Sequence, residues 1–357
     1  MAILNIYIAM KTILFCGGGS AGHVIPNIAL IEELKERFNC VYIGTNGIEK
    51  DICAQNNVKF YECNTPKLVR GKILTNLKLP FKLIKSVKNA DKLLDEIQPD
   101  LIFSKGGYAC FPAVWAAKKK NIAVITHESD IHPGLATRFI AKRCKKVLTS
   151  FPQTAKKFGN GIYTGSPMRK NLFNVDKAAA LERFGLDFRP TVVVLGGGSG
   201  SKIINENIRK IAAKLCKDYN ILHLCGKNNA TGTNIYGYKQ IEFSHNMGSV
   251  YACADVAVSR CGSNTAFELL ALKIPTLFIP LANSASRGDQ IKNAEYFQEK
   301  RLCQVLNEKE LTPDNLYNGI IDILKDKQIK SALDKSDVKC GNESIKTEVL
   351  RTLRQQS

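Results

Sequence analysis

The chain has 357 residues, of which 45% are hydrophobic and 23% are charged, a balance typical of a soluble globular protein long enough for two domains. No run approaches the ~20 apolar residues of a membrane-spanning helix, and the apolar residues 1–10 lack the basic start and cleavage site of a signal peptide. Because Met10 is the more natural start, residues 1–9 are taken as an extension. The net charge of +19 favours phosphate-rich partners or an anionic membrane surface.

Twelve cysteines are scattered along the chain without a C-x-x-C pair or zinc-like spacing. Many of them stand in apolar strand or helix contexts. We therefore expect buried free thiols of a reducing cytosol, and neither disulfides nor a metal site.

The first predicted unit is a strand, a glycine-rich turn and a helix. Apolar residues 12–16 lead into the first glycine turn (residues 17–22), and a helical apolar period runs from Pro26 to Phe38. Glycines allow positive φ and close approach of a ligand, while amides at a helix start attract anions. The second glycine turn (residues 196–201) repeats this arrangement after an apolar run. We therefore predict two α/β lobes whose glycine turns face one cleft.

The first glycine turn also satisfies the G-x-G-x-x-G fingerprint of dinucleotide-binding proteins. Binding of NAD would require an acidic residue at the end of the second strand, predicted at 40–45. That strand ends without one, and Glu49 and Asp51 come later, where we expect them to lie past the edge of the site. The missing acid and the neighbouring His23 weaken the NAD interpretation.

Residues 66–88 form a basic, apolar segment. Lysines and an arginine alternate with large aliphatic side chains, and no acidic residue appears before Asp91. This pattern suits an anionic bilayer surface, with lysines at the headgroups and apolar side chains at the acyl boundary. A helix packed on the domain with its lysines in water is an equal alternative. Nucleic acid is disfavoured, because stacking aromatic side chains are nearly absent here.

Two further strands of the first lobe end in glycine or polar residues. One, starting at Asp100, runs into Gly106-Gly107-Tyr108, and the other, starting at Ala123, runs into His127-Glu128-Ser129-Asp130. Ligands of open parallel sheets bind outside the carboxyl ends of strands. We therefore expect these two ends to share one site with the first glycine turn.

A break containing glycine and proline at residues 164–169 suits an interdomain hinge. In the second lobe, a strand starting at Asp255 ends at Arg260-Cys261-Gly262, and the loop after a later strand carries Asp289-Gln290. The tail from about Glu308 is expected to be helical. No Asp-x-Asp motif stands at a strand end and no Cys/His cluster exists, so the sequence predicts no metal site.

Seven motifs, in order across about residues 12–300, resemble the GT-B glycosyltransferases that add N-acetylglucosamine to undecaprenyl-diphospho-muramoyl-pentapeptide and so make lipid II, the peptidoglycan precursor. The motifs are Gly17 to His23, Gly106-Gly107-Tyr108, His127-Glu128, Gly165-Ser166-Pro167-Met168-Arg169, Gly196 to Gly200, Arg260-x-Gly262-x-x-Thr265-x-x-Glu268, and Asp289-Gln290. The chain departs from the usual family pattern at Ser20-Ala21, Ser129-Asp130 and Gly198-Ser199.

The resemblance implies two Rossmann-like parallel-sheet lobes facing a cleft. It implies an acceptor-binding, membrane-facing domain at 10–166, a UDP-GlcNAc domain at 167–340, and a helical tail at 341–357 that packs back on the first domain. It also implies inverting transfer from UDP-GlcNAc to the muramoyl 4-hydroxyl without metal or cofactor. The enzyme would act as a peripheral protein on the cytoplasmic face of the cell membrane.

His23 is the candidate general base, because histidine titrates near neutral pH and a helix start disfavours the imidazolium. A histidine that only bonds backbone is the alternative. The resemblance implies that Glu268 holds the ribose, Arg169 and Arg260 the diphosphate, and Gln290 the sugar. The remaining implied donor residues are Gly197, Gly198, Ser199, Gly262 and Thr265, and the implied acceptor residues are Gly18, Gly19, Ser20, Gly22, Gly106, Tyr108, His127 and Glu128.

For His127 and Glu128, a buried pair supporting the sheet edge is an equal alternative. His132, His223 and His245 are expected to be structural. The first glycine turn would then hold the lipid diphosphate and the second the nucleotide. Other possibilities are a diacylglycerol glucosyltransferase, a UDP-GlcNAc 2-epimerase, a nucleic-acid-binding protein or an NAD-dependent dehydrogenase.

Overall fold

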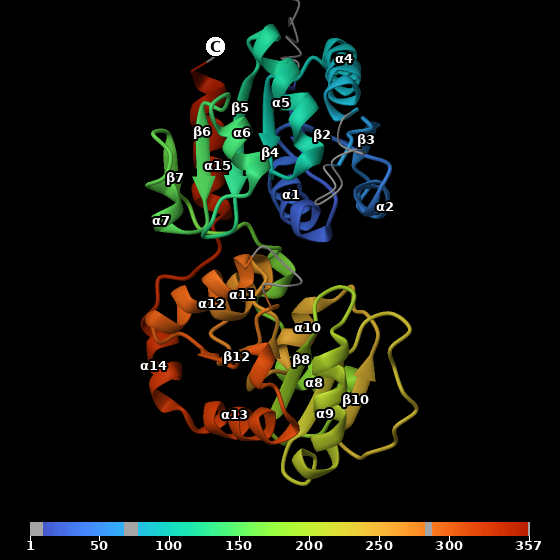
Figure 1. Cartoon of the computed structure of the whole chain (residues 1–357), viewed down its shortest axis with the longest axis vertical. Coiled ribbons are helices and arrows are strands. Elements are labelled where there is room, and N and C mark those ends of the chain that lie inside the picture. The colour runs from blue at the N-terminus through green and yellow to red at the C-terminus, as the bar shows by residue number, and fades with distance from the viewer. Residues whose placement is uncertain (1–9, 68–77, 283–287, 356–357) are drawn as a thin grey trace, which may run out of the picture. The chain divides into compact units, whose positions relative to one another are not determined.

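The computed structural model describes residues 10–67, 78–282 and 288–355 (Figure 1). The chain divides into two compact units. Unit 1 runs up to Arg169 and resumes at Gly341, and unit 2 comprises residues 170–340. The chain therefore leaves unit 1, builds unit 2, and returns to unit 1 for its last helix.

Unit 1 is built on a seven-stranded sheet with the order β3-β2-β1-β4-β5-β6-β7, in which every pairing is parallel. The strands are β1 Thr12–Cys16, β2 Asn39–Gly44, β3 Lys59–Glu62, β4 Leu101–Ser104, β5 Ala123–Glu128, β6 Lys146–Thr149 and β7 Gly161–Tyr163. The central strands are buried on both faces, which explains their continuous apolar runs.

Helices cover both faces of this sheet. One apolar core joins the strands to α1 (Ala21–Leu34), α2 (Ile48–Gln55) and α15 (Asn342–Arg354). The other joins them to α4 (Leu79–Ile97), α5 (Phe111–Ala117) and α6 (Leu135–Ala141). The short α7 (Pro152–Ala155) precedes β7. Figure 1 shows α15, in red, beside the strands of unit 1, where Ile345, Val349 and Leu353 are buried.

Helix α1 begins earlier than the sequence pattern indicated. The apolar period predicted a helix from Pro26 to Phe38, but α1 starts at Ala21 and ends at Leu34. Pro26 lies in the second turn of α1, where its ring removes one backbone hydrogen-bond donor from the helix. The earlier start places His23 in the first turn of α1, directly after the glycines.

Unit 2 is built on a six-stranded parallel sheet with the order β10-β9-β8-β11-β12-β13. Its strands are β8 Thr191–Leu195, β9 Asn220–Leu224, β10 Tyr238–Ile241, β11 Val256–Ser259, β12 Thr276–Phe278 and β13 Gln304–Val305. Its helices are α8 Lys177–Phe184, α9 Lys202–Leu215, α10 Met247–Ala252, α11 Ser263–Ala271, α12 Asp289–Glu299, α13 Pro313–Lys325 and α14 Lys327–Lys335.

Both sheets have the strand order of the Rossmann fold, which confirms the predicted fold class. The order reverses between β1 and β4 in unit 1 and between β8 and β11 in unit 2. Ligands of such sheets bind at the carboxyl side of this switch point. Each glycine turn follows the first strand of its sheet, so each lies at a switch point.

All twelve cysteines are free thiols, and ten of them are buried, as their apolar sequence contexts predicted. Burial raises the pKa of Cys144 and Cys303 to about 12. Within the described ranges, no helix is both long and apolar enough to cross a membrane.

Candidate active site

The first glycine turn packs against the end of β4. A Cβ atom added to Gly19, whose φ is +82°, would lie 2.6 Å from the Tyr108 ring. One added to Gly107 would lie 3.1 Å from the Gly18 carbonyl oxygen and 3.5 Å from the His23 ring. The structure therefore gathers these five residues at the switch point of unit 1, as the strand-end argument predicted.

His23 is half-buried, and its Nδ1 atom lies 3.0 Å from the Ser20 hydroxyl oxygen. Ser20 is the exposed residue that precedes α1. In the tautomer whose Nδ1 donates to Ser20, Nε2 carries the lone pair that a general base needs. Ser20 can thus orient the imidazole.

Glu49 lies against the first glycine turn, which corrects the expectation that it lies past the edge of the site. Its side chain is fully buried, and its carboxylate accepts hydrogen bonds from the Thr45 amide at 2.9 Å, the Thr45 hydroxyl and the Gly19 amide at 3.3 Å. The reason is local, because only three residues separate the end of β2 at Gly44 from the start of α2 at Ile48, so the first turn of α2 folds back over the strand end. The Gly19 amide, which was expected to face a ligand anion, therefore already donates its hydrogen bond to Glu49.

Lys105 is a buried cation at this edge that sequence reasoning missed. Its amide donates to the Cys16 carbonyl at 2.8 Å, and its ammonium donates to the Ser129 hydroxyl. Only 3% of the residue is exposed, and burial lowers its pKa to about 8, although Glu128 and Asp130 act in the opposite direction. The sequence feature that could have revealed Lys105 is its position directly between the buried strand β4 and Gly106.

His127 and Glu128 are buried at the end of β5. His127 donates from Nε2 to the Gly165 carbonyl at 3.0 Å, and burial lowers its pKa well below the usual range. The Glu128 carboxylate accepts hydrogen bonds from the Asp130 and Gly134 amides, each at 3.1 Å. These bonds favour the alternative in which the pair supports the sheet edge and its loops.

The second glycine turn has free space beside its glycines, whereas Glu49 and Tyr108 pack against the glycines of the first turn. Gly197, Gly198 and Ser199 are exposed, and a Cβ atom added to either glycine would meet no atom within 4 Å. Helix α9 starts at Lys202 and carries no acidic residue in its first turn. This turn leaves space for a ligand beside its backbone.

Arg260 lies at the end of β11, beside the second glycine turn, and is buried. Its guanidinium donates to the Ile279 carbonyl at 3.0 Å, to the Ser201 hydroxyl at 2.8 Å, and to Glu308 in an ion pair. The other Glu308 oxygen accepts from the Ala282 amide at 3.1 Å. Part of the charge expected to face a diphosphate is thus neutralised by Glu308, which was not among the predicted site residues.

Glu268 is buried on α11, and its Oε2 atom accepts a 2.8 Å hydrogen bond from the Tyr251 hydroxyl. Gly262 and Thr265, at the start of the same helix, are half-buried. Gln290, on α12, accepts from the Leu281 amide at 3.0 Å. These residues belong to the carboxyl side of the unit 2 sheet, following β11 and β12.

Arg169 belongs to unit 1, at its boundary with unit 2. Its Nε atom is buried and has no hydrogen-bond partner among the residues that the structure describes. Arg169 was predicted to bind the donor with residues that lie in unit 2.

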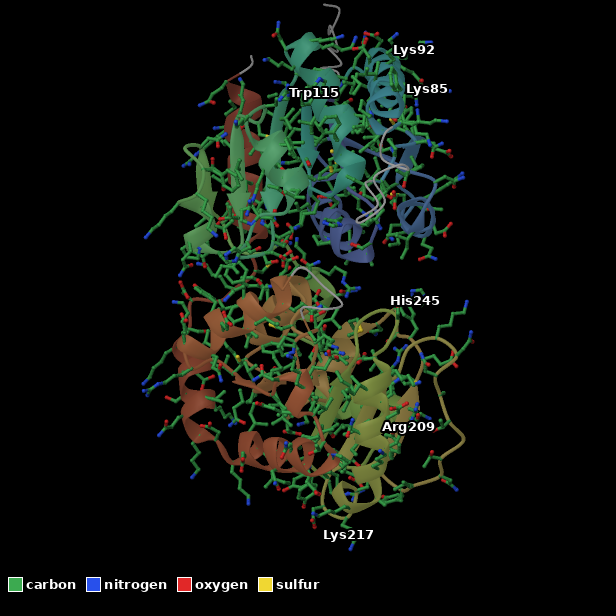
Figure 2. The ribbon with its side chains drawn as sticks, viewed as in Figure 1. Lys85, Lys92, Trp115, Arg209, Lys217 and His245 are labelled. Atoms are coloured by element: carbon green, nitrogen blue, oxygen red, sulfur yellow. The ribbon has the colours of Figure 1, made fainter. Side chains whose placement is uncertain are left out.

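A cavity of about 580 Å³ opens at the carboxyl end of β10. Phe243 and the exposed His245, labelled in Figure 2, line it with ring centroids 4.8 Å apart. Asn246, which caps α10, also lines it, and the same helix carries Tyr251, the partner of Glu268. His245, which was expected to be structural, lines this cavity.

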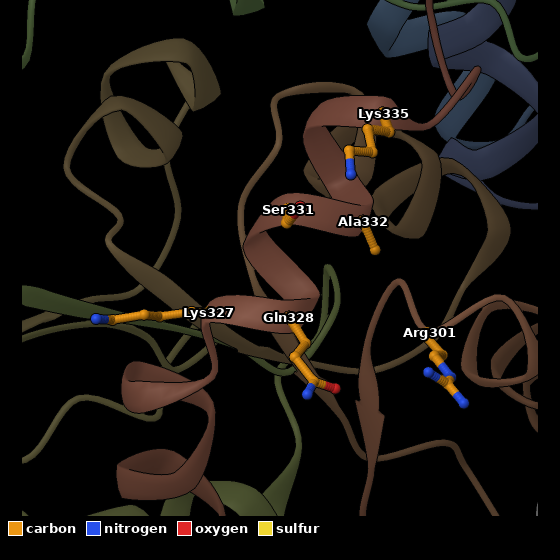
Figure 3. A pocket seen from close by; sticks show the side chains of 6 residues that line it. All are labelled: Arg301, Lys327, Gln328, Ser331, Ala332 and Lys335. Carbon is orange, nitrogen blue, oxygen red and sulfur yellow. The ribbon is translucent and has the colours of Figure 1, made fainter.

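A second cavity, of about 470 Å³, lies between Arg301 and α14 (Figure 3). Lys327 and Lys335 line it, but none of the predicted site residues does. Across the described ranges, no group of three or more His, Cys, Asp or Glu side chains is arranged to hold a metal ion.

Both units of the chain match domain models of one known protein family. Residues 13–149 match the glycosyltransferase family 28 N-terminal domain, and residues 191–348 match the glycosyltransferase family 28 C-terminal domain. The chain belongs to glycosyltransferase family 28.

Relatives of this glycosyltransferase align with it over nearly its whole length. A Clostridium botulinum (strain Alaska E43 / Type E3) protein, named UDP-N-acetylglucosamine--N-acetylmuramyl-(pentapeptide) pyrophosphoryl-undecaprenol N-acetylglucosamine transferase, is 41% identical over 96% of this chain and 98% of its own. The crystal structure of Acinetobacter baumannii MurG superposes with a TM-score of 0.75 at 20% identity, covering 96% of this chain and 99% of that one. A putative UDP-N-acetylglucosamine 2-epimerase from Listeria monocytogenes superposes with a TM-score of 0.67 at 12% identity, covering 96% of each chain. The two structures show the shared fold alone.

Proposed function

We propose that this glycosyltransferase transfers N-acetylglucosamine from UDP-N-acetylglucosamine to undecaprenyl-diphospho-muramoyl-pentapeptide and so forms lipid II. The observation that carries the proposal is the 41% identity, over 96% of the chain, to a relative named for this transfer. The attacking group is the muramoyl 4-hydroxyl, and the anomeric carbon is inverted.

Unit 1 binds the acceptor in this proposal, through Gly18, Gly19, Ser20, Gly22, Gly106 and Tyr108. His23 Nε2 takes the proton of the acceptor hydroxyl while the oxygen attacks the anomeric carbon. The bond from that carbon to the diphosphate oxygen breaks, and UDP leaves with the electron pair. The Ser20 contact supports this role, because it fixes the ring that must receive the proton. His127 and Glu128 act by holding the strand-end loops in place.

Unit 2 binds the donor in this proposal. The exposed amides of Gly197, Gly198 and Ser199 and the start of α9 receive the diphosphate, supported by the open space above them. Arg260 contributes partly through Ser201, which it holds. Glu268 accepts the ribose hydroxyls, Gln290 holds the sugar, and Gly262 and Thr265 complete the set in unit 2. Arg169, the last residue of unit 1 before unit 2 begins, stays a predicted donor residue.

The described part of the basic, apolar segment supports docking on an anionic membrane surface. On α4, Phe81 and Ile84 are 76% and 56% exposed, and Lys82, Lys85 and Lys88 are exposed beside them. Figure 2 shows Lys85 projecting from this helix. Residues 68–77 of the segment lie outside the described residues.

Helix α6 extends the same surface. Helices α4, α5 and α6 pack on one face of the unit 1 sheet, and Leu135 and Phe139 of α6 are exposed as well. Apolar side chains among lysines suit a headgroup boundary, where ammonium groups meet lipid phosphates. We propose that this face holds the enzyme peripherally at the cytoplasmic side of the membrane.

An acceptor screen with UDP-N-acetylglucosamine as the donor distinguishes this function from a lipid glycosyltransferase and from a 2-epimerase. Radiolabelled UDP-N-acetylglucosamine is offered with a lipid I analogue, with diacylglycerol, or alone. We expect label only in the lipid I product. Transfer to diacylglycerol alone, or conversion to UDP-N-acetylmannosamine without acceptor, would replace the proposal with a lipid glucosyltransferase-like or an epimerase function.

A further inference from the structure

The Glu49 side chain fills a space that three glycines leave for it. A Cβ atom added to Gly18 would lie 2.3 Å from Glu49 Oε1, one added to Gly44 would lie 2.9 Å from its Cγ, and one added to Gly47 would lie 3.1 Å from its Oε2. Because the Glu49 side chain is fully buried and hydrogen-bonded to Thr45 and Gly19, it has little room to move aside for an added Cβ atom. The carboxylate is therefore held at a fixed place against the first glycine turn.

The partners of this carboxylate are all hydrogen-bond donors without formal charge. They are the Thr45 amide and hydroxyl and the Gly19 amide. Among the residues that the structure describes, Glu49 forms no ion pair. A buried carboxylate without a paired cation therefore lies directly under a turn of the kind that usually cradles phosphate.

This arrangement works against an anion at the Gly18–Gly19 end of the turn. The Gly19 amide already donates to Glu49, and a second negative charge there would be repelled by the buried Glu49 carboxylate. The second glycine turn differs, because a Cβ atom at Gly197 or Gly198 would meet nothing within 4 Å. The two turns look alike in sequence but offer opposite environments to phosphate.

We propose that Glu49 is a specificity-determining residue that closes the Gly18–Gly19 end of the first turn to phosphate groups. The turn then presents Ser20 and His23 to the neutral sugar hydroxyls of the acceptor, and the acceptor diphosphate lies away from Gly18 and Gly19. The inference rests on the proposed function in assigning this turn to the acceptor. It replaces the expectation that the turn holds the lipid diphosphate.

The test is binding of inorganic diphosphate to the full chain, measured by calorimetry at low salt with UDP saturating the donor site. Glu49→Gln keeps the shape of the side chain, removes its charge and frees the Gly19 amide. We expect diphosphate to bind this variant about tenfold more tightly than the wild type, or better. Asp51→Asn, which neutralises an exposed carboxylate on the same helix, is the matched control and should leave the affinity unchanged. Equal affinity in wild type and Glu49→Gln would overturn the proposal.

A measurement on the wild type tests whether phosphate binds at the first glycine turn even if Glu49→Gln does not fold. Hydrogen exchange is followed by mass spectrometry with and without inorganic diphosphate. We expect protection at residues 196–201 and none at residues 17–22, and protection at residues 17–22 would contradict the proposal. Neither measurement uses an acceptor or a transfer step, so failure of the lipid II assay and failure of this inference are separate outcomes.

Discussion

His23 is the side chain on which turnover should depend most. Its ring lies beside Gly107 and is oriented by Ser20, so removing it leaves the acceptor hydroxyl without a base. We expect His23→Ala to lower kcat by about 10²–10⁴-fold, the usual contribution of a general base. UDP affinity, measured by calorimetry, serves as the control and should not change. Wild-type turnover in this variant would remove His23 from the chemistry.

Glu268 should act on donor binding and not on the acceptor. A carboxylate that accepts ligand hydroxyls contributes about 1.5–3 kcal/mol, so Glu268→Ala should weaken UDP binding by about ten- to a hundredfold. Tyr251→Phe removes only the hydroxyl that holds Glu268 and should cause a smaller loss. Calorimetric titration with UDP ranks the two variants, and an unchanged affinity in Glu268→Ala would return this residue to a structural role.

Single residues were predictable from sequence only where a motif marked them. His23, Gly107 and Tyr108 stand at predicted strand ends, and the structure brings them together. Glu49 and Glu308 could not be predicted in this way, because each contacts its site from another element of the fold. Glu49 reaches the first glycine turn because α2 folds back over the end of β2. Glu308 forms an ion pair with Arg260, which lies 48 residues earlier in the sequence.

At the scale of elements, α4 carries a prediction about membranes. Replacing Phe81 and Ile84 with serine should reduce binding to vesicles containing anionic lipid, because the exposed apolar groups that enter the headgroup region are lost. Phe188→Ser is the matched control, since Phe188 is also highly exposed but lies in unit 2. Sedimentation with vesicles measures the effect. A loss of binding in the control, or none in the α4 variant, would contradict a docking role for this face.

The elements that sequence predicted best are the central strands. Runs such as residues 191–195 are apolar throughout because parallel strands are buried on both faces, and β8 has these bounds. The predicted start of α1 was wrong because the apolar period was followed only from Pro26, although this proline lies inside the helix. The two-residue β13 is too short to leave any periodic signal.

At the scale of the whole molecule, buried neutral histidines predict a loss of stability in mild acid. His223 lies between the Tyr238 hydroxyl and the Asn205 side chain, each at 2.9 Å, and burial lowers its pKa from 6.5 to about 3. Below pH 6.5 the unfolded chain takes up a proton that the folded chain refuses, so stability falls as the pH drops from 6.5 towards 3. The expected loss from His223 is about 2 kcal/mol between pH 7 and pH 5.

Urea unfolding at pH 7 and pH 5 measures this loss. In His223→Gln, the difference in unfolding free energy between the two pH values should shrink by about 2 kcal/mol. His245→Gln, at an exposed histidine, is the control and should keep the wild-type difference. An unchanged difference in His223→Gln would show that His223 is not held neutral by burial.

The division into two Rossmann-like units follows from the repeated strand-turn-helix pattern, and both sheets have the predicted parallel topology. What the pattern could not supply is the difference between the two turns. The sequences of both turns are typical of glycine-rich phosphate-binding turns. Only the structure shows that the Glu49 carboxylate lies under the first turn and that open space lies beside the second.

The most direct measurement of the proposed function is the structure of the transfer product. The purified full chain is given radiolabelled UDP-N-acetylglucosamine and a lipid I analogue, and the lipid product is analysed by NMR. We expect label in the lipid fraction and a β-linkage to the muramoyl 4-hydroxyl, since the donor is the α-anomer and the transfer inverts it. A folded enzyme that leaves the lipid unlabelled, or that forms an α-linkage, would contradict it.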